Sequence, residues 1–390
     1  MRLIHTSDWH LGRKLKGEDR TPEIAAALDE LLNRAKDLKV DAVLVAGDIY
    51  DRPNPPAEAE QVAYSFFAKL KEANIPAIII AGNHDSHLRF DSAAKILPYV
   101  GVQALGRPQK AENGGVINID TSAGKLCIAA MPFASEKRLL KYEDLWSKDD
   151  LEQRLYYRDR VKTFLNRLAR EFKGDRVNVI MAHMTIEGIQ RAHSEVDFCT
   201  QDSYVIPGQM LPNVAQYIAL GHIHKPQQVS NSVPTYYSGS LIQVDFGEAE
   251  EEKGFNLVEV EPGRPAKVEF ISIPCQKPLK VIECNEANLE ETLAAQREHP
   301  GFLKVVVKIN TSKIGLAETV RKICPQALIV EPKYPNVEPK KRVELQEDYQ
   351  FDAVKEFQNY YSHTKGIEEV PTAILEAFKQ LHQEMNDAIA

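Results

Sequence analysis

Short apolar segments alternate with helical segments over the first 85 residues, and this alternation restricts the fold more than any other feature of the chain. The apolar segments are 2–5, 41–46 and 76–81. The segments 22–38 and 56–73 between them carry apolar residues at helical spacing. Strands that are apolar along their whole length are buried on both faces, as in a parallel sheet covered by helices. The first part of the chain is therefore predicted to be an α/β structure.

The strand pattern continues less regularly to about residue 273. Further strands are predicted at 125–131, 177–182 and 217–220, with a charged helical stretch over 149–172 between the first two. The segments 235–238, 255–260 and 268–273 alternate like strands of a second sheet. We expect the two sheets to pack face to face with helices outside.

The C-terminal part reads as separate pieces. After a composition break at 274–278, strand and helix patterns alternate as in a small α/β domain over 278–334, so the first domain is expected to cover 1–274. A basic, proline-rich linker is expected over 335–346. Two amphipathic helices, at 349–362 and 371–389, form a tail over 347–390. The tail either folds back on the small domain or docks on another protein; both interpretations remain open, and the linker slightly favours docking.

Charge and cysteine content bear on partners and location. The chain has 48 basic and 56 acidic side chains and a net charge of -8, which argues against a protein that grips DNA tightly on its own. Its five cysteines are scattered without a close pair, so we expect them to be reduced and structural. Neither a signal sequence nor a membrane span is recognisable, which predicts a cytoplasmic protein, associated with the nucleoid if DNA is its substrate.

Five predicted strands end on side chains that can bind a metal ion. In open α/β sheets such side chains meet at the carboxyl ends of the strands. The glycines beside them allow sharp turns and close approach. A single motif of this kind would be attributed to polar residues in turns, but five in series indicate a site. They are Asp8-x-His10, Gly47-Asp48, Gly82-Asn83-His84-Asp85, Ala182-His183 and Gly221-His222-Ile223-His224.

The donor set indicates the kind of ion. Imidazole, carboxylate and one amide oxygen, without thiolate, exclude a structural zinc site and suit a catalytic pair of Mn²⁺, Fe²⁺ or Zn²⁺ ions. A pair needs a bridging carboxylate, for which Asp48 is the candidate. On an extended segment residues i and i+2 point the same way, so Asp8 with His10, and His222 with His224, are expected to face the site together.

Two neighbours of Asn83 have other candidate roles. His84 need not bind metal and is a candidate to stabilise the transition state or to protonate the leaving oxygen. Asp85 is a candidate to orient a histidine or to cap the next helix.

Together these motifs resemble the calcineurin-like metallophosphoesterase superfamily. More narrowly, His5-Thr-Ser-Asp-Trp-His-Leu-Gly12, Ala46-Gly-Asp-Ile-Tyr-Asp51 and Ala219-Leu-Gly-His-Ile-His224 resemble the nuclease subunits that work with an SMC-like ATPase on DNA ends. The likeness is dense over residues 1–245. It implies a four-layer α-β-β-α sandwich with a small α/β capping domain and a C-terminal helical tail. It also implies 3′→5′ exonuclease activity on duplex DNA and endonuclease activity on single strands and hairpins.

The resemblance also implies roles for residues and partners. His84 would be the catalytic histidine, and the capping domain would help to position DNA. One Mn²⁺ ion would be held by Asp8, His10, Asp48 and His224, and the other by Asp48, Asn83, His183 and His222. The tail would dock on the coiled coil of the ATPase, with contacts from Phe357, Tyr361, Leu375, Phe378, Leu381 and Met385. Helices near 56–70 and 88–98 would form a homodimer interface through Phe66, Phe67, Leu88, Phe90 and Leu97, for which ordinary core is an equal interpretation.

One position departs from the family pattern. Archaeal and eukaryotic relatives carry a histidine shortly after the Gly-Asp motif, where this chain has Asp51. Asp51 is thus a candidate to orient a ligand, and His84 is left as the one histidine of this kind. Candidate DNA contacts are Arg13, Lys14, Lys16 and Arg89. A small-substrate phosphatase or nucleotidase, and a DNA-end scaffold without catalysis, are the two alternative functions.

Overall fold

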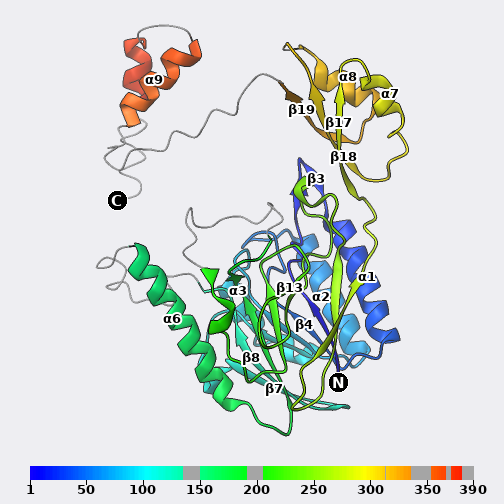
Figure 1. Ribbon diagram of the computed structural model, residues 1–390, viewed down its shortest axis with the longest axis vertical. Helices are drawn as coiled ribbons and strands as arrows, with labels where there is room; N and C mark the ends of the chain where they lie inside the picture. Colours follow the sequence, from blue (N-terminus) through cyan, green and yellow to red (C-terminus); the bar gives the residue numbers. More distant parts are fainter. Residues whose placement is uncertain (135–149, 191–204, 312, 335–352, 366–369, 380–390) are drawn as a thin grey trace. The chain divides into compact units, whose positions relative to one another are not determined.

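The computed structural model describes residues 1–134, 150–190, 205–311, 313–334, 353–365 and 370–379 (Figure 1). The chain divides into two compact units, Met1–Pro335 and Asn336–Ala390. The first unit contains the two large sheets and a third, small one, and the second contains the helical tail.

The first large sheet has the strand order β16-β15-β1-β4-β5-β6. Its parallel strands are β1 (Arg2–Thr6), β4 (Ala42–Val45), β5 (Ala77–Ile80) and β6 (Val102–Leu105). On the other side of β1, β15 (Gly254–Glu259) and β16 (Lys267–Ser272) add antiparallel pairs. The predicted apolar strands of the first 85 residues therefore form the parallel half of this sheet.

The second large sheet has the order β13-β14-β12-β9-β8-β7. Four neighbouring strands run parallel: β14 (Thr235–Tyr237), β12 (Tyr217–Gly221), β9 (Val177–His183) and β8 (Gly124–Met131). The edge strands β13 (Gln227–Val229) and β7 (Val116–Thr121) are antiparallel to their neighbours. Two short pairs lie outside the large sheets, β2 (Lys14–Leu15) with β3 (Glu18–Asp19) and β10 (Thr185–Ile186) with β11 (Val205–Ile206).

Side chains that alternate along the strands separate three cores. On the first sheet Leu3, Leu44 and Ile78 face a core shared with Ile128 and Val179 of the second sheet. Their chain neighbours pack on α1 (Thr21–Asp37) and α2 (Ala57–Glu72) instead. The outer face of the second sheet packs on α6 (Asp150–Leu168). The expected four-layer α-β-β-α arrangement is confirmed, and Figure 1 shows α1 and α6 outside the sheets.

One prediction about sheet membership is wrong. Segments 255–260 and 268–273 were expected in the second sheet with 235–238, but they are β15 and β16 of the first sheet, paired to β1. An alternating pattern reports that one face of a strand is buried, and it carries no information on which sheet provides the neighbour.

The small sheet has the order β17-β18-β19 and is parallel throughout. Its strands are β17 (Leu279–Asn285), β18 (Phe302–Lys308) and β19 (Ala327–Lys333), joined by α7 (Leu289–Ala294) and α8 (Leu316–Ile323). It has its own apolar core around Leu293, Val305 and Val320. A separate cluster joins it to the larger part of the unit through Leu15, Phe246, Leu279 and Phe302. Domains at 1–274 and 278–334 remain our proposal for how this unit is organised.

The tail is helical where it is described. Helix α9 covers Ala353–Lys365, and residues 372–379 form a second helix. The rings of Phe357 and Phe378 stack at 4.1 Å between centroids, so these helices contact each other through an aromatic pair. The predicted linker 335–346, Leu381 and Met385 lie outside the described residues.

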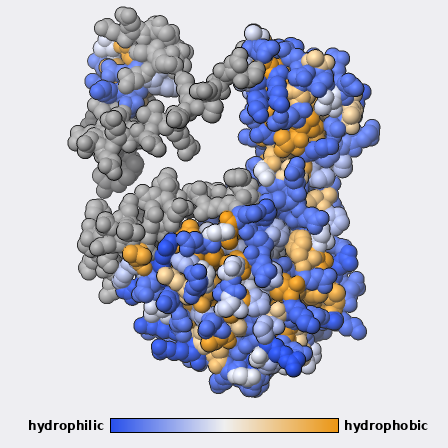
Figure 2. All heavy atoms as spheres, viewed as in Figure 1, coloured by the Kyte–Doolittle hydropathy of each residue, from blue (hydrophilic) through white to orange (hydrophobic). Residues whose placement is uncertain are grey.

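The described surface is mainly hydrophilic on the face drawn in Figure 2, and the described cysteines are free. No helix among the described residues is long and apolar enough to cross a membrane. On the face drawn in Figure 2, hydrophilic side chains predominate over the described atoms, and apolar ones occur as small patches. Cys127, Cys275, Cys284 and Cys324 are free thiols, while Cys199 lies outside the described residues.

Candidate metal centre

The carboxyl ends of five strands meet at one site. β1, β4 and β5 of the first sheet and β9 and β12 of the second all end there. Three sets of side chains have their ligand atoms within 4.8 Å of one another, and they overlap. The sets are Asp8, His10 and His224; His10, Asp48 and His84; and Asp48, His183 and His222.

Four of the candidate ligands have backbone angles that the sequence did not predict. Asp8, His10, Asp48 and His222 have φ angles of 53°, 52°, 51° and 100°, in the left-handed region that side chains rarely adopt. The D/H-x-H residues converge as predicted, but the reason given from extended alternation is wrong for Asp8, His10 and His222. Strained conformations of this kind cluster at functional sites.

Two glycines are required by close approach. A Cβ on Gly82 would lie 2.1 Å from Oδ1 of Asp48, and a Cβ on Gly47, which has a φ of 100°, would lie 2.3 Å from Nδ1 of His183. Neither contact is tolerable for a real Cβ atom. The loops that carry the candidate ligands can therefore come together only if these positions lack side chains.

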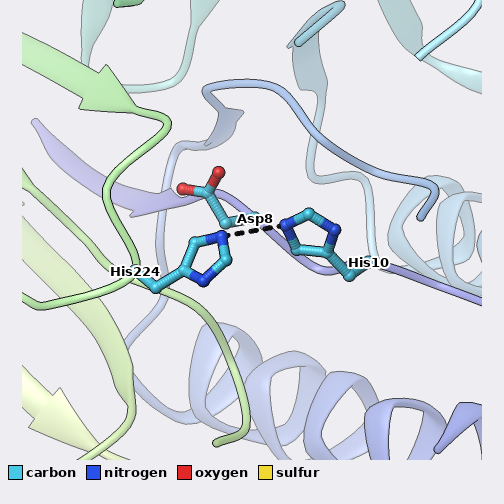
Figure 3. Close-up of side chains that lie close together, drawn as sticks. All are labelled: Asp8, His10 and His224. Carbon is cyan, nitrogen blue, oxygen red and sulfur yellow. Dashed lines mark hydrogen bonds between the residues drawn. The ribbon is translucent and has the colours of Figure 1, made fainter. Parts of the chain in front are cut away.

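The first set combines residues from both sheets (Figure 3). Nε2 of His10 lies 3.0 Å from Nε2 of His224, and the Asp8 carboxylate lies beside them. Both Asp8 oxygens are 3.1 Å from the backbone N–H of His222, and Ser7 donates its hydroxyl to Oδ2. The Asp8 carboxylate is thus fixed by two donors.

Two histidines of the third set, His183 and His222, contact the amide oxygen of Asn83. This Oδ1 atom is 2.8 Å from Nε2 of His183 and 2.8 Å from Nδ1 of His222. The other ring nitrogen of His183, Nδ1, lies 2.8 Å from the carbonyl oxygen of Ala46, to which it donates. This leaves the Nε2 lone pair of a neutral His183 directed at the other candidate ligands.

Asp48 belongs to two of the three sets, one with His10 and one with His183. Its Oδ2 atom is 3.9 Å from Nε2 of His10 and 3.5 Å from Nε2 of His183, and Oδ1 accepts a hydrogen bond of 2.8 Å from the backbone of His84. The carboxylate is 1% exposed. This is the position that a bridging ligand requires.

Opposite charges and burial compete in this cluster. Burial raises the pKa of Asp48, but His183, His84 and His10 lower it well below its usual range. Burial lowers the pKa of His183, but the Asp48 carboxylate raises it to about 9. For His222, burial and the charge of His183 lower the pKa to about 3. A concentration of polar groups this deep requires compensating charge.

The donor set fits divalent cations. The Nε2 atoms of His10 and His224 face each other at 3.0 Å. Unless one of them carries a proton, their lone pairs repel each other, and a cation bound by both nitrogens relieves this repulsion. His183 and His224 each direct the opposite ring nitrogen at a protein oxygen, Ala46 O and Glu248 Oε1. Histidine ligands of metal ions are oriented by such partners.

His84 lies at the edge of the cluster. Its Nδ1 atom lies 2.8 Å from the carbonyl oxygen of Asp51, and its ring centroid lies 4.8 Å from that of His10. The Asp51 side chain is 3.4 Å from Nδ1 of His10 and 3.2 Å from Nη1 of Arg13. Asp51 thus contacts a candidate ligand, as expected for a residue that orients one.

Among the described contacts, Asp85 makes neither of the two that were expected for it, a contact with a histidine and a helix cap. Its carboxylate accepts backbone hydrogen bonds from Ile49 at 3.2 Å, Tyr50 at 3.0 Å and Gly82 at 2.9 Å. The N-cap of the next helix, α3 (His87–Ala93), is Ser86. Asp85 therefore ties the loop that carries Asp48 to the loop that carries Asn83.

The candidate DNA contacts differ in accessibility. Lys14 and Lys16 are exposed on the β2–β3 hairpin, which follows His10 closely. Arg13 is half-buried and paired with Asp51. Arg89 forms an ion pair with Glu60 of α2.

Sequence reasoning did not find two buried charges behind His224. Glu248 lies 2.9 Å from Nδ1 of His224 and 2.7 Å from Nζ of Lys253, and both charged side chains are completely buried. Glu248 follows His224 by 24 residues, without a motif to connect them. Only the folded structure brings them together.

Comparisons with known proteins agree with this site. The calcineurin-like phosphoesterase family matches residues 1–226. The SbcD component of the SbcCD nuclease of Bacillus subtilis is 30% identical over 340 residues, which cover 78% of this chain and 85% of that one. The corresponding Escherichia coli K12 protein is 28% identical over 79% of this chain and 78% of its own.

Among solved structures, a dimetal phosphatase from Danio rerio covers 67% of this chain and 92% of its own at 12% identity, with a TM-score of 0.39 that is too low to support an argument. The family match and the relatives agree with each other over the part of the chain that carries the site. The chain belongs to the calcineurin-like phosphoesterase family and, within it, to the SbcD group.

Proposed function

We propose that this chain is the nuclease subunit of a complex with an SMC-like ATPase of the SbcC type, and that it hydrolyses phosphodiester bonds of DNA with two manganese ions. The observation that carries the proposal is that Asp48 belongs to two of the three sets of ligand atoms that lie within 4.8 Å of one another, with His10 in one and His183 in the other. A shared carboxylate between two such sets is the arrangement of a two-metal hydrolase. The relatives are named as components of the SbcCD nuclease, and this name supports the substrate class and the partner.

Each ion has a proposed set of ligands. One is Asp8, His10, Asp48 and His224, and the other is Asp48, Asn83, His183 and His222. Bound divalent ions would supply Lewis-acid activation of the phosphoryl group and of the attacking water. Asp48 would be shared by both ions, and the Asp8 carboxylate is held in place by the backbone N–H of His222.

His84 is the proposed catalytic histidine. Its Nδ1 proton is directed at the carbonyl oxygen of Asp51, which fixes the tautomer and leaves proton exchange to Nε2. Its backbone N–H donates to Asp48, so the residue is tied to the bridging ligand as well. This placement suits a group that protonates a leaving oxygen or stabilises the pentavalent state.

The DNA-directed part of the proposal includes 3′→5′ exonuclease activity on duplexes and endonuclease activity on single strands and hairpins. The exposed basic residues Lys14 and Lys16 follow His10 on a hairpin that also exposes the acidic Glu18 and Asp19, in a chain whose net charge is -8. A partner that engages DNA compensates for this net charge. The small domain would help to position the DNA.

The tail is the proposed contact for the ATPase. Phe357, Tyr361, Leu375 and Phe378 are each partly exposed, although Phe357 and Phe378 stack on one another. Removing residues after Lys340 should abolish copurification with SbcC and leave Mn²⁺ binding unchanged. Continued association of the shortened chain would reject this contact.

The homodimer proposal needs a change of residues. Phe66, Phe67, Phe90 and Leu97 belong to the core of this chain, so they cannot form an interface. Leu88 is 62% exposed. Other exposed large apolar side chains in this part of the sequence are Tyr64 of α2, Ile96, which precedes η1 (Leu97–Val100), and Tyr99 of η1.

The test of the proposed function compares substrates. Labelled duplex and hairpin DNA, 4-nitrophenyl phosphate and nucleoside monophosphates are incubated with the full chain and Mn²⁺, with and without SbcC. We expect DNA to be degraded and the monoesters to react slowly. Efficient monoester hydrolysis with inert DNA would establish a phosphatase, and binding of DNA ends without any hydrolysis would establish a scaffold.

A further inference from the structure

A buried ion pair lies directly behind the ring of His224. Glu248 is the last residue of η5 (Phe246–Glu248), and its carboxylate has no exposed surface. Oε1 lies 2.9 Å from Nδ1 of His224, and Oε2 lies 2.7 Å from Nζ of Lys253. Buried charges are costly unless they are paired and hydrogen-bonded, and this pair has no part in the motifs that indicate the metal site.

The neighbours of the Glu248 carboxylate show that it is ionised. Oε2 accepts the backbone N–H of Val244 at 2.9 Å and lies 3.4 Å from the hydroxyl of Ser240. The buried ammonium group of Lys253 is a further donor to the same oxygen, at 2.7 Å, so a proton on Oε2 is excluded. A positive charge at this distance in a buried site stabilises the carboxylate form of Glu248.

The ionised carboxylate determines the tautomer of His224. A carboxylate only accepts hydrogen bonds, so Nδ1 of His224 must carry a proton and donate it to Oε1. In the neutral ring Nε2 then has a lone pair, and this is the atom that lies 3.0 Å from Nε2 of His10 in the first set of ligand atoms.

Lys253 fixes the same unit from a second side. Its Nζ atom donates to the carbonyl oxygen of His224 at 2.9 Å and to Oε2 of Glu251 at 2.8 Å, besides Glu248. One buried ammonium group therefore contacts both the main chain of His224 and the carboxylate that orients its ring. Such a network has little freedom to rearrange.

We propose that Glu248 is a positioning residue that holds His224 in the metal-binding tautomer, and that Lys253 keeps this carboxylate charged and in place. The inference rests on the proposed two-metal function. It concerns the ion held by Asp8, His10, Asp48 and His224. The other ion has separate support, because His183 is oriented by the Ala46 carbonyl oxygen.

The experiment measures metal binding in the absence of DNA. Mn²⁺ is titrated calorimetrically into the full metal-free chain, and the electron paramagnetic resonance spectrum reports whether two ions are coupled. Wild-type protein should bind two ions. In Glu248→Gln, one ion should bind about 10- to 100-fold more weakly, the other should be nearly unchanged, and the coupled spectrum should be lost at limiting Mn²⁺.

Glu251→Gln is the matched control. Glu251 contacts the same Lys253 and lies in the same loop, but its side chain is 15% exposed and has no hydrogen bond to the His224 ring among the described contacts. This variant should bind both ions like the wild type. Equal weakening in Glu251→Gln would show that general loop stability, and no specific orientation of His224, accounts for the effect.

A second variant covers the case that Glu248→Gln does not fold because the buried Lys253 has lost one of its two carboxylate partners. Glu248→Gln with Lys253→Met removes both charges and should fold, judged by circular dichroism in EDTA, while one ion still binds weakly. Wild-type affinity for both ions in either variant would overturn the inference. Failure of the wild type itself to bind two ions would instead reject the proposed function.

Discussion

The Nδ1 atom of His84 is 2.8 Å from the carbonyl oxygen of Asp51, so a main-chain group orients the proposed catalytic histidine. The side chain of Asp51 is not used for this contact and lies 3.4 Å from Nδ1 of His10. Asp51 therefore contacts two histidines, His84 through its carbonyl oxygen and His10 through its carboxylate. Asp51 stands where the family pattern has a histidine. This difference leaves the orientation of His84 intact, because every residue type supplies a carbonyl oxygen.

Replacement of His84 should separate chemistry from metal binding. His84→Gln removes the group that exchanges a proton but keeps the backbone N–H that donates to Asp48. DNA cleavage should fall about 10²- to 10⁴-fold, the usual contribution of general acid–base catalysis. Calorimetry should still find two Mn²⁺ ions, and full cleavage activity in this variant would reject the assignment.

Replacement of Asp51 should give a smaller effect. Asp51→Asn removes the charge beside His10 and leaves the carbonyl oxygen that accepts from His84. We expect Mn²⁺ affinity or cleavage to fall about 10-fold, toward the low end of the range for groups that orient ligands. A loss as large as that in His84→Gln would show that the Asp51 side chain takes part in catalysis.

A single methyl group at Gly82 should disable the site. In Gly82→Ala the new Cβ would lie 2.1 Å from Oδ1 of Asp48 and 2.4 Å from its backbone nitrogen, so the bridging carboxylate must move. We expect at least about a 100-fold loss of cleavage, since small misplacements at a reaction centre have effects of this size. Gly174→Ala is the control, because a Cβ there meets nothing within 4 Å.

Metal affinity should rise with pH. Burial lowers the pKa of His183, but Asp48 raises it to about 9 in the metal-free protein, so His183 must lose a proton when it binds an ion. Affinity for one Mn²⁺ should increase about tenfold per pH unit up to about pH 9 and then level off. Calorimetry in buffers with different ionisation enthalpies measures this proton release, and an affinity independent of pH would contradict the prediction.

The same pKa determines how the metal-free protein responds to pH. Because the pKa of His183 lies above its ordinary value of 6.5, its pair with Asp48 stabilises the fold fully below about pH 6.5 and loses this contribution as the pH rises toward about 9. Urea unfolding in EDTA at about pH 6 and about pH 9 should therefore give a lower free energy of unfolding at the higher pH.

Asp85 should matter for stability more than for chemistry. Asp85→Ala leaves the backbone N–H groups of Ile49, Tyr50 and Gly82 without their buried acceptor. Each such loss costs about 1–3 kcal/mol, so unfolding in urea should shift by at least about 3 kcal/mol. A change below about 1 kcal/mol would show that water replaces the carboxylate.

Much of this structure is predictable from local patterns. The strands 41–46 and 76–81, the helices between them and the convergence of Asp8, Asp48 and His183 all follow from periodicity and from the rule that parallel strands end at one edge. The assignment of β15 and β16 to a sheet does not follow, because pairing with β1 joins residues that are about 250 positions apart in the sequence.

The site shows the same division. Its candidate ligands are visible in the sequence because each follows an apolar strand. Their left-handed backbone at Asp8, His10 and His222 is not visible, since tertiary contacts stabilise conformations that these residues avoid in isolation. Glu248 and Lys253 are likewise beyond local patterns, because only burial distinguishes them from the acidic and basic residues around them.

The apolar cluster around Leu15 and Phe246 connects the small domain unequally to the two proposed ions. Leu15 lies in the hairpin that follows His10, and Phe246 begins the turn that ends at Glu248, while Leu279 and Phe302 belong to the small domain. Among the described residues, this cluster includes no segment next to Asn83, His183 or His222. The small domain therefore packs on the segment that follows His10 and on the segment that ends at Glu248, so its apolar contacts adjoin ligands and supports of one proposed ion.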